Sequence, residues 1–138
     1  MYLIDTNVIS ELRKAAKPSV DPRVLQWAQE TPPEQMWVSA ISIFELELGV
    51  LRAECKDTKQ GRVLRTWLTR QVIPAFEGRI IAIDAHVAQV AARMHVPNPQ
   101  PERDALIAAS AIIHGLTMVT RDEKDFRPMG VATLNPWE

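Results

Sequence analysis

Short, solidly apolar runs alternate with longer segments of helical periodicity, and this alternation constrains the fold more than any other feature of the sequence. The apolar runs predict strands at residues 2–4, 36–38, 80–83, 116–119 and 131–134. Strands that are apolar throughout are typical of a parallel sheet buried on both faces by helices. We therefore predict an α/β fold in which a short, mostly parallel central sheet is flanked by helices.

Capping residues and breakers divide the helical segments. Thr6 or Asn7 is predicted to cap the first helix, and Ser39 or Ser42 a later helix that runs to residue 51. A charged segment, residues 54–61, is predicted to separate that helix from the next one. The last long helix is predicted over residues 103–114 and is apolar on nearly all sides, which indicates deep burial.

Length and charge limit the possible classes of protein. The 138 residues suit one domain, which we assign to residues 1–138. The formal net charge of −1 means that RNA binding would need a local basic surface or a metal ion. The chain has no secretory leader and no apolar run of about 20 residues, which predicts a cytoplasmic protein with no membrane partner. The single cysteine, Cys55, suits a reducing compartment and is predicted to be a packing residue.

Four acids fall where parallel strands end. Asp5 follows the first strand, Asp122 follows the strand at 116–119, Glu45 lies about one turn into the helix after the second strand, and Asp104 starts the apolar helix. Because ligands bind beyond the carboxyl ends of parallel strands, we expect these carboxylates to converge. Each acid alone has an ordinary explanation as a cap, a turn residue or a solvated charge. Together they would repel one another, and a Mg²⁺ or Mn²⁺ ion with oxygen ligands would remove that conflict.

Four sequence blocks, taken in order, resemble the PIN-domain family, and more narrowly the VapC and FitB toxin nucleases of bacterial type II toxin–antitoxin systems. The blocks are residues 3–7 (Leu-Ile-Asp-Thr-Asn), residues 38–39 followed by Glu45 and Gly49, residues 104–109 (Asp-Ala-Leu-Ile-Ala-Ala) and residues 120–126 (Thr-Arg-Asp-Glu-Lys-Asp-Phe). The first block alone is weak, whereas the ordered set covers essentially the whole chain. The resemblance implies a PIN-like α/β/α sandwich that forms a single PIN domain.

The resemblance also implies roles for particular residues. The catalytic and metal-binding acids would be Asp5, Glu45, Asp104 and Asp122. Many relatives carry asparagine where Asp122 stands and use the aspartate three positions later, so Asp125 is a possible additional acid, and the choice between the two stays open. Thr6, Asn7 and Thr120 would orient the acids and metal-bound water, although ordinary capping is an equal alternative for Asn7.

The implied activity is metal-dependent hydrolysis of single-stranded or structured-loop RNA by an endoribonuclease. A Mg²⁺ or Mn²⁺ ion would lower the pKa of a bound water and neutralise the phosphate, so no Ser, Cys or His nucleophile is needed. The three histidines, His86, His95 and His114, are interpreted as non-catalytic. The implied partners are the RNA substrate, a cognate antitoxin that blocks the site, and a second copy of the chain in a homodimer.

Two further sets of residues are candidates for binding surfaces. RNA-binding candidates near the acids are Arg13, Lys14, Lys17, Arg121 and Lys124, and a second basic patch is Arg62, Arg65 and Arg70. A solvated face is the alternative for both groups. Apolar candidates for the dimer or antitoxin surface are Trp27, Leu46, Val50 and Trp67, for which core packing is an equally good explanation.

Two rival functions remain open. An aspartyl phosphotransfer domain would use Asp5 as phosphoacceptor, but a dehalogenase-type phosphatase needs an aspartate where Asn7 stands. A non-catalytic PIN fold would keep the same architecture for RNA or protein contacts alone. The intact set of acids argues against that rival, because an idle acid cluster would cost stability.

Overall fold

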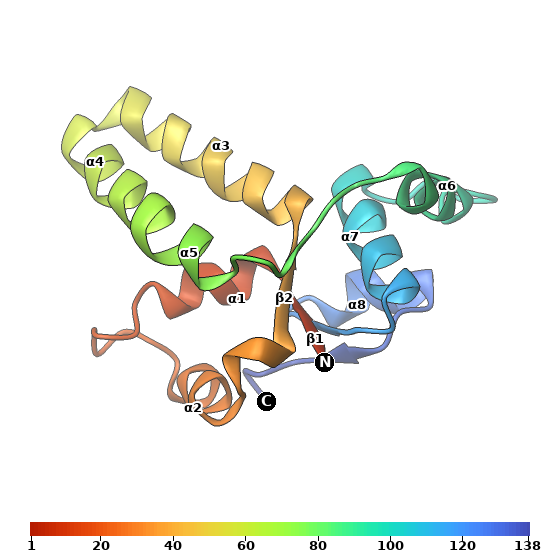
Figure 1. Cartoon of the computed structure of the whole chain (residues 1–138), viewed down its shortest axis with the longest axis horizontal. Helices are drawn as coiled ribbons and strands as arrows, with labels where there is room; N and C mark the ends of the chain where they lie inside the picture. Colours follow the sequence, from red (N-terminus) through yellow and green to blue (C-terminus); the bar gives the residue numbers. More distant parts are fainter.

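Five short strands form one parallel sheet at the centre of the molecule (Figure 1). The computed structural model describes all residues 1–138 and gives the strand order β3-β2-β1-β4-β5. The strands are β1 (Tyr2–Ile4), β2 (Met36–Ser39), β3 (Ile80–Ile81), β4 (Thr117–Val119) and β5 (Thr133–Leu134). Every neighbouring pair is parallel, which confirms the predicted α/β class.

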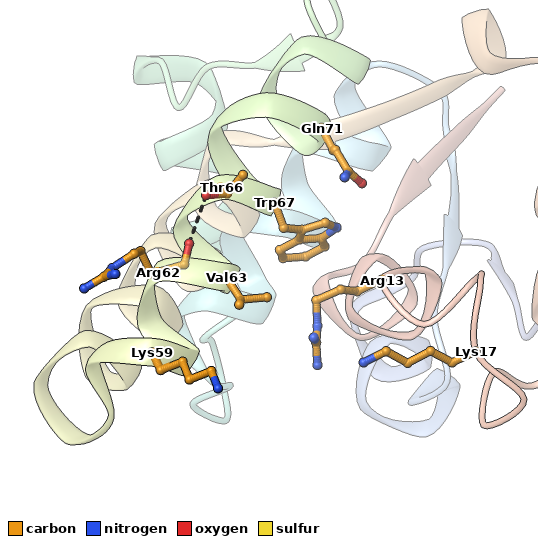
Figure 2. A pocket seen from close by; sticks show the side chains of 8 residues that line it. All are labelled: Arg13, Lys17, Lys59, Arg62, Val63, Thr66, Trp67 and Gln71. Carbon is orange, nitrogen blue, oxygen red and sulfur yellow. Dashed lines mark hydrogen bonds between the residues drawn. The ribbon is translucent and has the colours of Figure 1, made fainter.

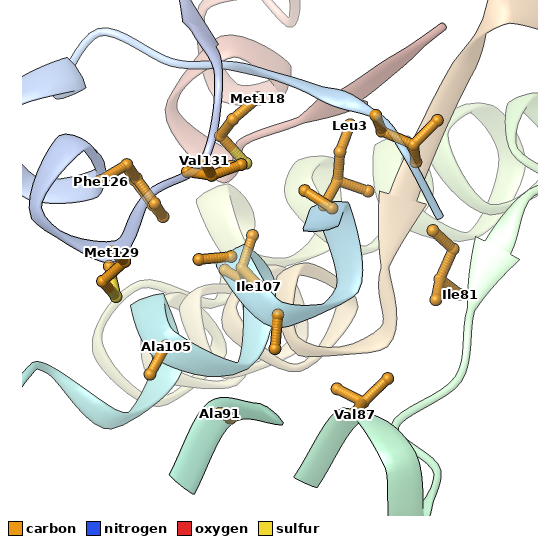
Figure 3. Close-up of a cluster of buried hydrophobic side chains, with 14 residues drawn as sticks. Leu3, Ile81, Val87, Ala91, Ala105, Ile107, Met118, Phe126, Met129 and Val131 are labelled. Atoms are coloured by element: carbon orange, nitrogen blue, oxygen red, sulfur yellow. The ribbon is translucent and has the colours of Figure 1, made fainter. Parts of the chain in front are cut away.

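Helices cover both faces of this sheet, and alternate strand residues point to opposite sides. Leu3 and Met118 are fully buried in one apolar cluster (Figure 3), whereas Ile4 and Val119 are buried in the other. The strands are apolar throughout because each contributes to both clusters. Figure 1 shows the helices of the first half of the chain on one side and the later helices on the other.

The helices fall into two groups by the cluster that they help to form. The first group consists of α1 (Thr6–Leu12), α2 (Pro22–Glu30), α3 (Ala40–Lys56), α4 (Thr58–Trp67), a π-helical turn (Leu68–Val72) and α5 (Ile73–Ala75). The second group consists of α6 (Ala85–Arg93), α7 (Glu102–Ile113) and α8 (Glu123–Phe126). Single 3₁₀ turns occupy Pro33–Gln35 and Arg127–Met129. None of the helices combines the length and apolarity that crossing a membrane requires.

The charged segment at residues 54–61 is helical, so its prediction as a separator was wrong. Helix α3 continues to Lys56, and only Asp57 leaves the helical conformation, with φ −149° and ψ 98°. The Asp57 side chain accepts hydrogen bonds from the backbone N–H groups at the start of α4. Gly61 lets the two helices pack closely, because a Cβ there would lie 2.5 Å from the Cα of Glu54. A single capping residue, Asp57, therefore separates α3 from α4 where a longer separating segment was expected.

Two smaller predictions also need correction. Cys55 is exposed in the last turn of α3 and is not a packing residue. The N-cap of α1 is Asp5, and neither Thr6 nor Asn7 fills that position. Ser39 caps α3, as one of the two predicted alternatives, by accepting a hydrogen bond from the backbone N–H of Ile41.

Candidate functional site

The acids singled out from the sequence lie at the carboxyl edge of the sheet. Asp5 directly follows β1, and Asp122 lies three residues after β4, which pairs with β1. Glu45 projects from α3, the helix that follows β2 on the other side of β1. Asp104 lies in the first turn of α7. The parallel topology therefore brings together side chains from four separate elements.

Asp5 is the buried centre of this group, with only 8% of its surface exposed. Its Oδ1 accepts a hydrogen bond from the backbone N–H of Thr6 at 2.8 Å. Its Oδ2 accepts another from the Oγ1 hydroxyl of Thr120 at 2.7 Å. Both carboxylate oxygens are therefore held in place, one by the start of α1 and the other by the end of β4.

Hydrogen bonds link the remaining acids to the same neighbours. The Oγ1 hydroxyl of Thr6 donates to Oε1 of Glu45 at 2.7 Å. The Nδ2 amide of Asn7 donates to Oδ2 of Asp122 at 3.1 Å. The Oγ1 of Thr120 also accepts from the backbone N–H of Asp122 at 3.0 Å. The three polar residues named from the sequence thus connect Asp5, Glu45 and Asp122 into one network.

Burial and mutual repulsion disturb the ionisation of two acids. Burial is the main cause that raises the pKa of Asp5 from 3.8 to about 6, and the charges of Glu45 and Asp104 raise it further against the lowering effect of its two hydrogen bonds. The pKa of Asp104 is also raised, mainly by burial and then by the charges of Glu45, Asp125 and Asp122. Both Asp122 and Asp125 therefore lie close enough to act on Asp104, and the geometry admits either as the fourth acid.

The donor set fits a hard divalent cation in its chemistry. It contains carboxylate, hydroxyl and amide oxygens and no thiol or imidazole, which suits Mg²⁺ or Mn²⁺. With the side chains as they stand, no three Asp, Glu, His or Cys residues surround a common point where an ion would sit. Coordination would therefore need rotation of at least one carboxylate. Repulsion within the cluster accounts for part of the rise in both pKa values, and a cation would relieve that repulsion.

The family model described as PIN domain matches residues 2–131. The chain belongs to the PIN-domain family. It is 39% identical to Toxin FitB of Neisseria gonorrhoeae over 99% of each chain, and 34% identical to VapC ribonuclease Y4jK of Sinorhizobium fredii over 100% of this chain and 99% of the relative. Its fold matches the crystal structure of FitAcB from Neisseria gonorrhoeae with a TM-score of 0.88 at 37% identity, covering 100% of this chain and 99% of that chain. The resemblance seen in the sequence is confirmed.

The basic residues proposed near the site of this PIN domain do not all remain free. Lys14 is paired with Glu11 at 3.0 Å, whereas Arg121 and Lys124 are exposed on the segment that carries Asp122. The predicted patch of Arg62, Arg65 and Arg70 does not form as a unit. Arg65 is bound to Glu47 at 2.6 Å and to Glu54 at 3.1 Å, because packing of α4 on α3 places it between them.

The remaining candidates separate into core and surface. Leu46 and Val50 are 6% and 2% exposed, so core packing is the correct explanation for both. Trp27 packs edge-on against Tyr2, with ring centroids 5.4 Å apart. Trp67 is half-buried beside two cavities.

The three histidines are not connected to the acids. His86 and His114 are exposed, and His95 accepts a hydrogen bond from the backbone N–H of Gln100. No hydrogen bond joins a histidine to the acids.

Sequence reasoning missed Arg103, which reaches into the acid cluster of the PIN domain. Its guanidinium Nη1 lies 3.9 Å from Oε2 of Glu45, and its Cζ lies 4.9 Å from the centre of the Phe44 ring. The only available signal was its position immediately before Asp104. Arg103 therefore gives partial compensation of the negative charge at the rim of the site.

The raised pKa of Asp5 predicts a distinct pH dependence for the metal-free PIN domain. The folded state binds the Asp5 proton more tightly than the unfolded chain does, so stability from this group falls as the pH rises from 3.8 to about 6. Compared with Asp5→Asn, wild type is expected to lose about 2 kcal/mol of unfolding free energy between pH 4 and pH 7. Urea denaturation of both proteins in chelator measures this difference, and a difference independent of pH would contradict the assignment.

Proposed function

We propose that this PIN domain is a metal-dependent endoribonuclease that cleaves single-stranded RNA or the loops of structured RNA. The observation that carries the proposal is the convergence of Asp5, Glu45 and Asp104, together with Asp122 and Asp125, at one edge of the sheet, where their charges act on one another. The similarity to a toxin and to a ribonuclease over essentially the full chain supports it. We further propose that the chain is the toxin of a toxin–antitoxin pair.

In this proposal Asp5, Glu45, Asp104 and Asp122 hold Mg²⁺ or Mn²⁺, with Asp125 as an additional acid. When bound, such an ion supplies charge neutralisation for the phosphate and lowers the pKa of water, which is the chemistry that phosphodiester hydrolysis needs. The oxygen-only donor set supports the choice of metal.

The polar neighbours have a positioning role in this proposal. Thr120 fixes one oxygen of Asp5 and the backbone of Asp122, so it sets the spacing between two acids. Thr6 similarly ties Glu45 to the start of α1 through its hydroxyl. Supporting contacts of this kind orient metal ligands, and their loss commonly costs about 10- to 100-fold in affinity or activity.

Substrate phosphates need positive charge close to the acids. Arg121 and Lys124 flank Asp122 in sequence and are both exposed, so they are suited to receive the RNA backbone. Arg103, on α7, already approaches Glu45. Single strands are the favoured substrate because their bases can be splayed out and their backbone can approach the acids more readily than that of a duplex.

The rival functions fit the geometry less well. Phosphoryl transfer to Asp5 of the dehalogenase type would need an aspartate where Asn7 stands. A non-catalytic PIN module would have no use for acids that repel one another. The cognate antitoxin, the homodimer and action in the cytoplasm are proposals that rest on the similarity to FitB and VapC toxins.

The test is RNA cleavage by purified protein with Mg²⁺ or Mn²⁺, and with excess chelator. We expect cleavage of a labelled single-stranded RNA only with metal, and recovery when metal is restored to the chelated sample. Cleavage that persists in excess chelator would contradict metal dependence. RNA binding without cleavage at any metal concentration would favour the non-catalytic module, and phosphoprotein formation with a small phosphodonor would favour phosphotransfer.

A further inference from the structure

A cavity of about 540 Å³ lies between the end of α1 with its following loop and the side of α4 that faces them (Figure 2). We call it the basic pocket, because four of its lining residues are Arg13, Lys17, Lys59 and Arg62. In Figure 2 the side chains of Arg13 and Lys17 on one wall face Lys59 on the other, and Arg62 lies at the outer edge. Cations from segments far apart in the sequence are thus gathered around one space.

The positive charge of the basic pocket is not compensated. No acidic residue lines it, and none of its four cations takes part in an ion pair. Other basic residues nearby behave differently, since Lys14 pairs with Glu11 and Arg65 with Glu47. Like charges gathered without a counter-ion destabilise the fold, and an anionic ligand would remove that cost.

The pocket also contains an aromatic ring. Trp67 lies between the two walls (Figure 2) and also lines an adjoining apolar cavity. Thr66 and Gln71 add hydrogen-bonding groups to the lining. A groove that combines cations with an aromatic ring is typical of single-stranded nucleic acid binding, in which phosphates contact the cations and bases stack on the ring.

The basic pocket is connected to the acid cluster by a single helix. Helix α1 is capped by Asp5 at its start and by Arg13 at its end. Asp5 and Arg13 are eight residues apart in the sequence, which is about 12 Å at the α-helical rise of 1.5 Å per residue. A strand that occupies the basic pocket can therefore continue along α1 to the acids, which favours an RNA ligand over an unrelated anion.

We propose that the basic pocket is a second RNA-binding subsite, which holds a single-stranded segment of the substrate away from the bond that is cut. Lys17 and Lys59 contact backbone phosphates there, and a base stacks on Trp67. The inference rests on the proposed ribonuclease function and extends it by naming where the rest of the substrate binds.

The test is binding of a fluorescent single-stranded oligoribonucleotide in chelator, where cleavage does not contribute, across a range of salt concentrations. For Lys17→Gln/Lys59→Gln, the slope of log Kobs against log salt is expected to become shallower by about 1.4, since each phosphate contact contributes about 0.7 for a single strand. Trp67→Leu is expected to weaken binding about fivefold or more with an unchanged salt slope, because it removes stacking and no charge.

A matched control is Arg52→Gln/Arg93→Gln, which removes two unpaired, exposed cations outside the pocket and gives the same net charge. We expect the control to keep the wild-type slope. Equal slopes for the two double variants would overturn the inference. The inference would also be overturned if the pocket bound an acidic peptide and the lysine substitutions left RNA binding unchanged. That result would assign the pocket to a protein partner.

A cleavage arm separates this inference from the proposed function. With Mn²⁺, the Lys17→Gln/Lys59→Gln protein is expected to show a raised KM and an unchanged kcat, because chemistry at the acids is intact. If wild type shows no cleavage, the proposed function fails, whatever the binding data show. If wild type cleaves and the pocket variants match it in KM and salt slope, the inference alone fails.

Discussion

Asp5→Asn is expected to lower metal-dependent RNA cleavage about a hundredfold or more, because it removes a charge that the proposed metal site needs. The same substitution should leave the fold intact. Asparagine has nearly the same shape, and its carbonyl oxygen can still accept a hydrogen bond from Thr6 or Thr120. It also removes a buried charge that Glu45 and Asp104 repel, so the variant should be at least as stable as wild type in chelator at pH 7.

The matched control for this prediction is Glu47→Gln. Glu47 lies on the same helix as Glu45, two residues away, but its carboxylate binds Arg65 on α4 and not the acid cluster. Initial rates of RNA cleavage with Mn²⁺ should therefore match wild type for Glu47→Gln and collapse for Asp5→Asn. Comparable rates for Asp5→Asn and wild type would show that the acid cluster is not the catalytic centre.

The position of the acid cluster could be predicted from the sequence because it depends on short-range patterns and one topological rule. Apolar runs marked the strands, and Asp5 and Asp122 each follow one of them. Once the sheet is parallel, residues at strand ends must meet at one edge. Glu45 and Glu47 lie two residues apart on α3, so the turn of the helix directs them to different sides, and they belong to different hydrogen-bond networks.

The hydrogen-bond pattern within the site was less predictable. Thr6, Asn7 and Thr120 were recognised as partners of the acids, but Asp5 itself takes the cap of α1. The choice between Asp122 and Asp125 does not follow from the sequence, because Asp122 is the N-cap of the short helix α8, Asp125 lies within it, and the charges of both act on Asp104. Periodicity specifies faces of long helices well and gives little information about a turn of this length.

Long-range pairing explains most of what sequence reasoning could not reach. From the sequence, Arg65 was expected to be a free cation, because its partners, Glu47 and Glu54, come from another helix. That contact exists because α3 and α4 pack closely where Gly61 has no side chain. The basic pocket depends on the same packing, since α4 places Lys59 opposite the end of α1. Local sequence gives no measure of such distances.

Divalent metal is expected to stabilise the wild-type protein strongly, because an ion that binds only the folded state shifts the unfolding equilibrium. Relief of repulsion among Asp5, Glu45 and Asp104 is the physical source of this binding energy. At Mn²⁺ about a hundredfold above its Kd, the free energy of unfolding should rise by about 2.7 kcal/mol. For a chain of this length, that gain corresponds to an increase in Tm of about 9 °C.

Thermal unfolding with and without Mn²⁺, for wild type, Asp104→Asn and Glu47→Gln, is the measurement that tests the acid cluster as a metal site most directly, because it needs no RNA. We predict that Mn²⁺ raises the Tm of wild type and Glu47→Gln equally and leaves the Tm of Asp104→Asn almost unchanged. A wild-type Tm that does not respond to Mn²⁺, or an equal increase in Asp104→Asn, would contradict a metal site formed by these acids.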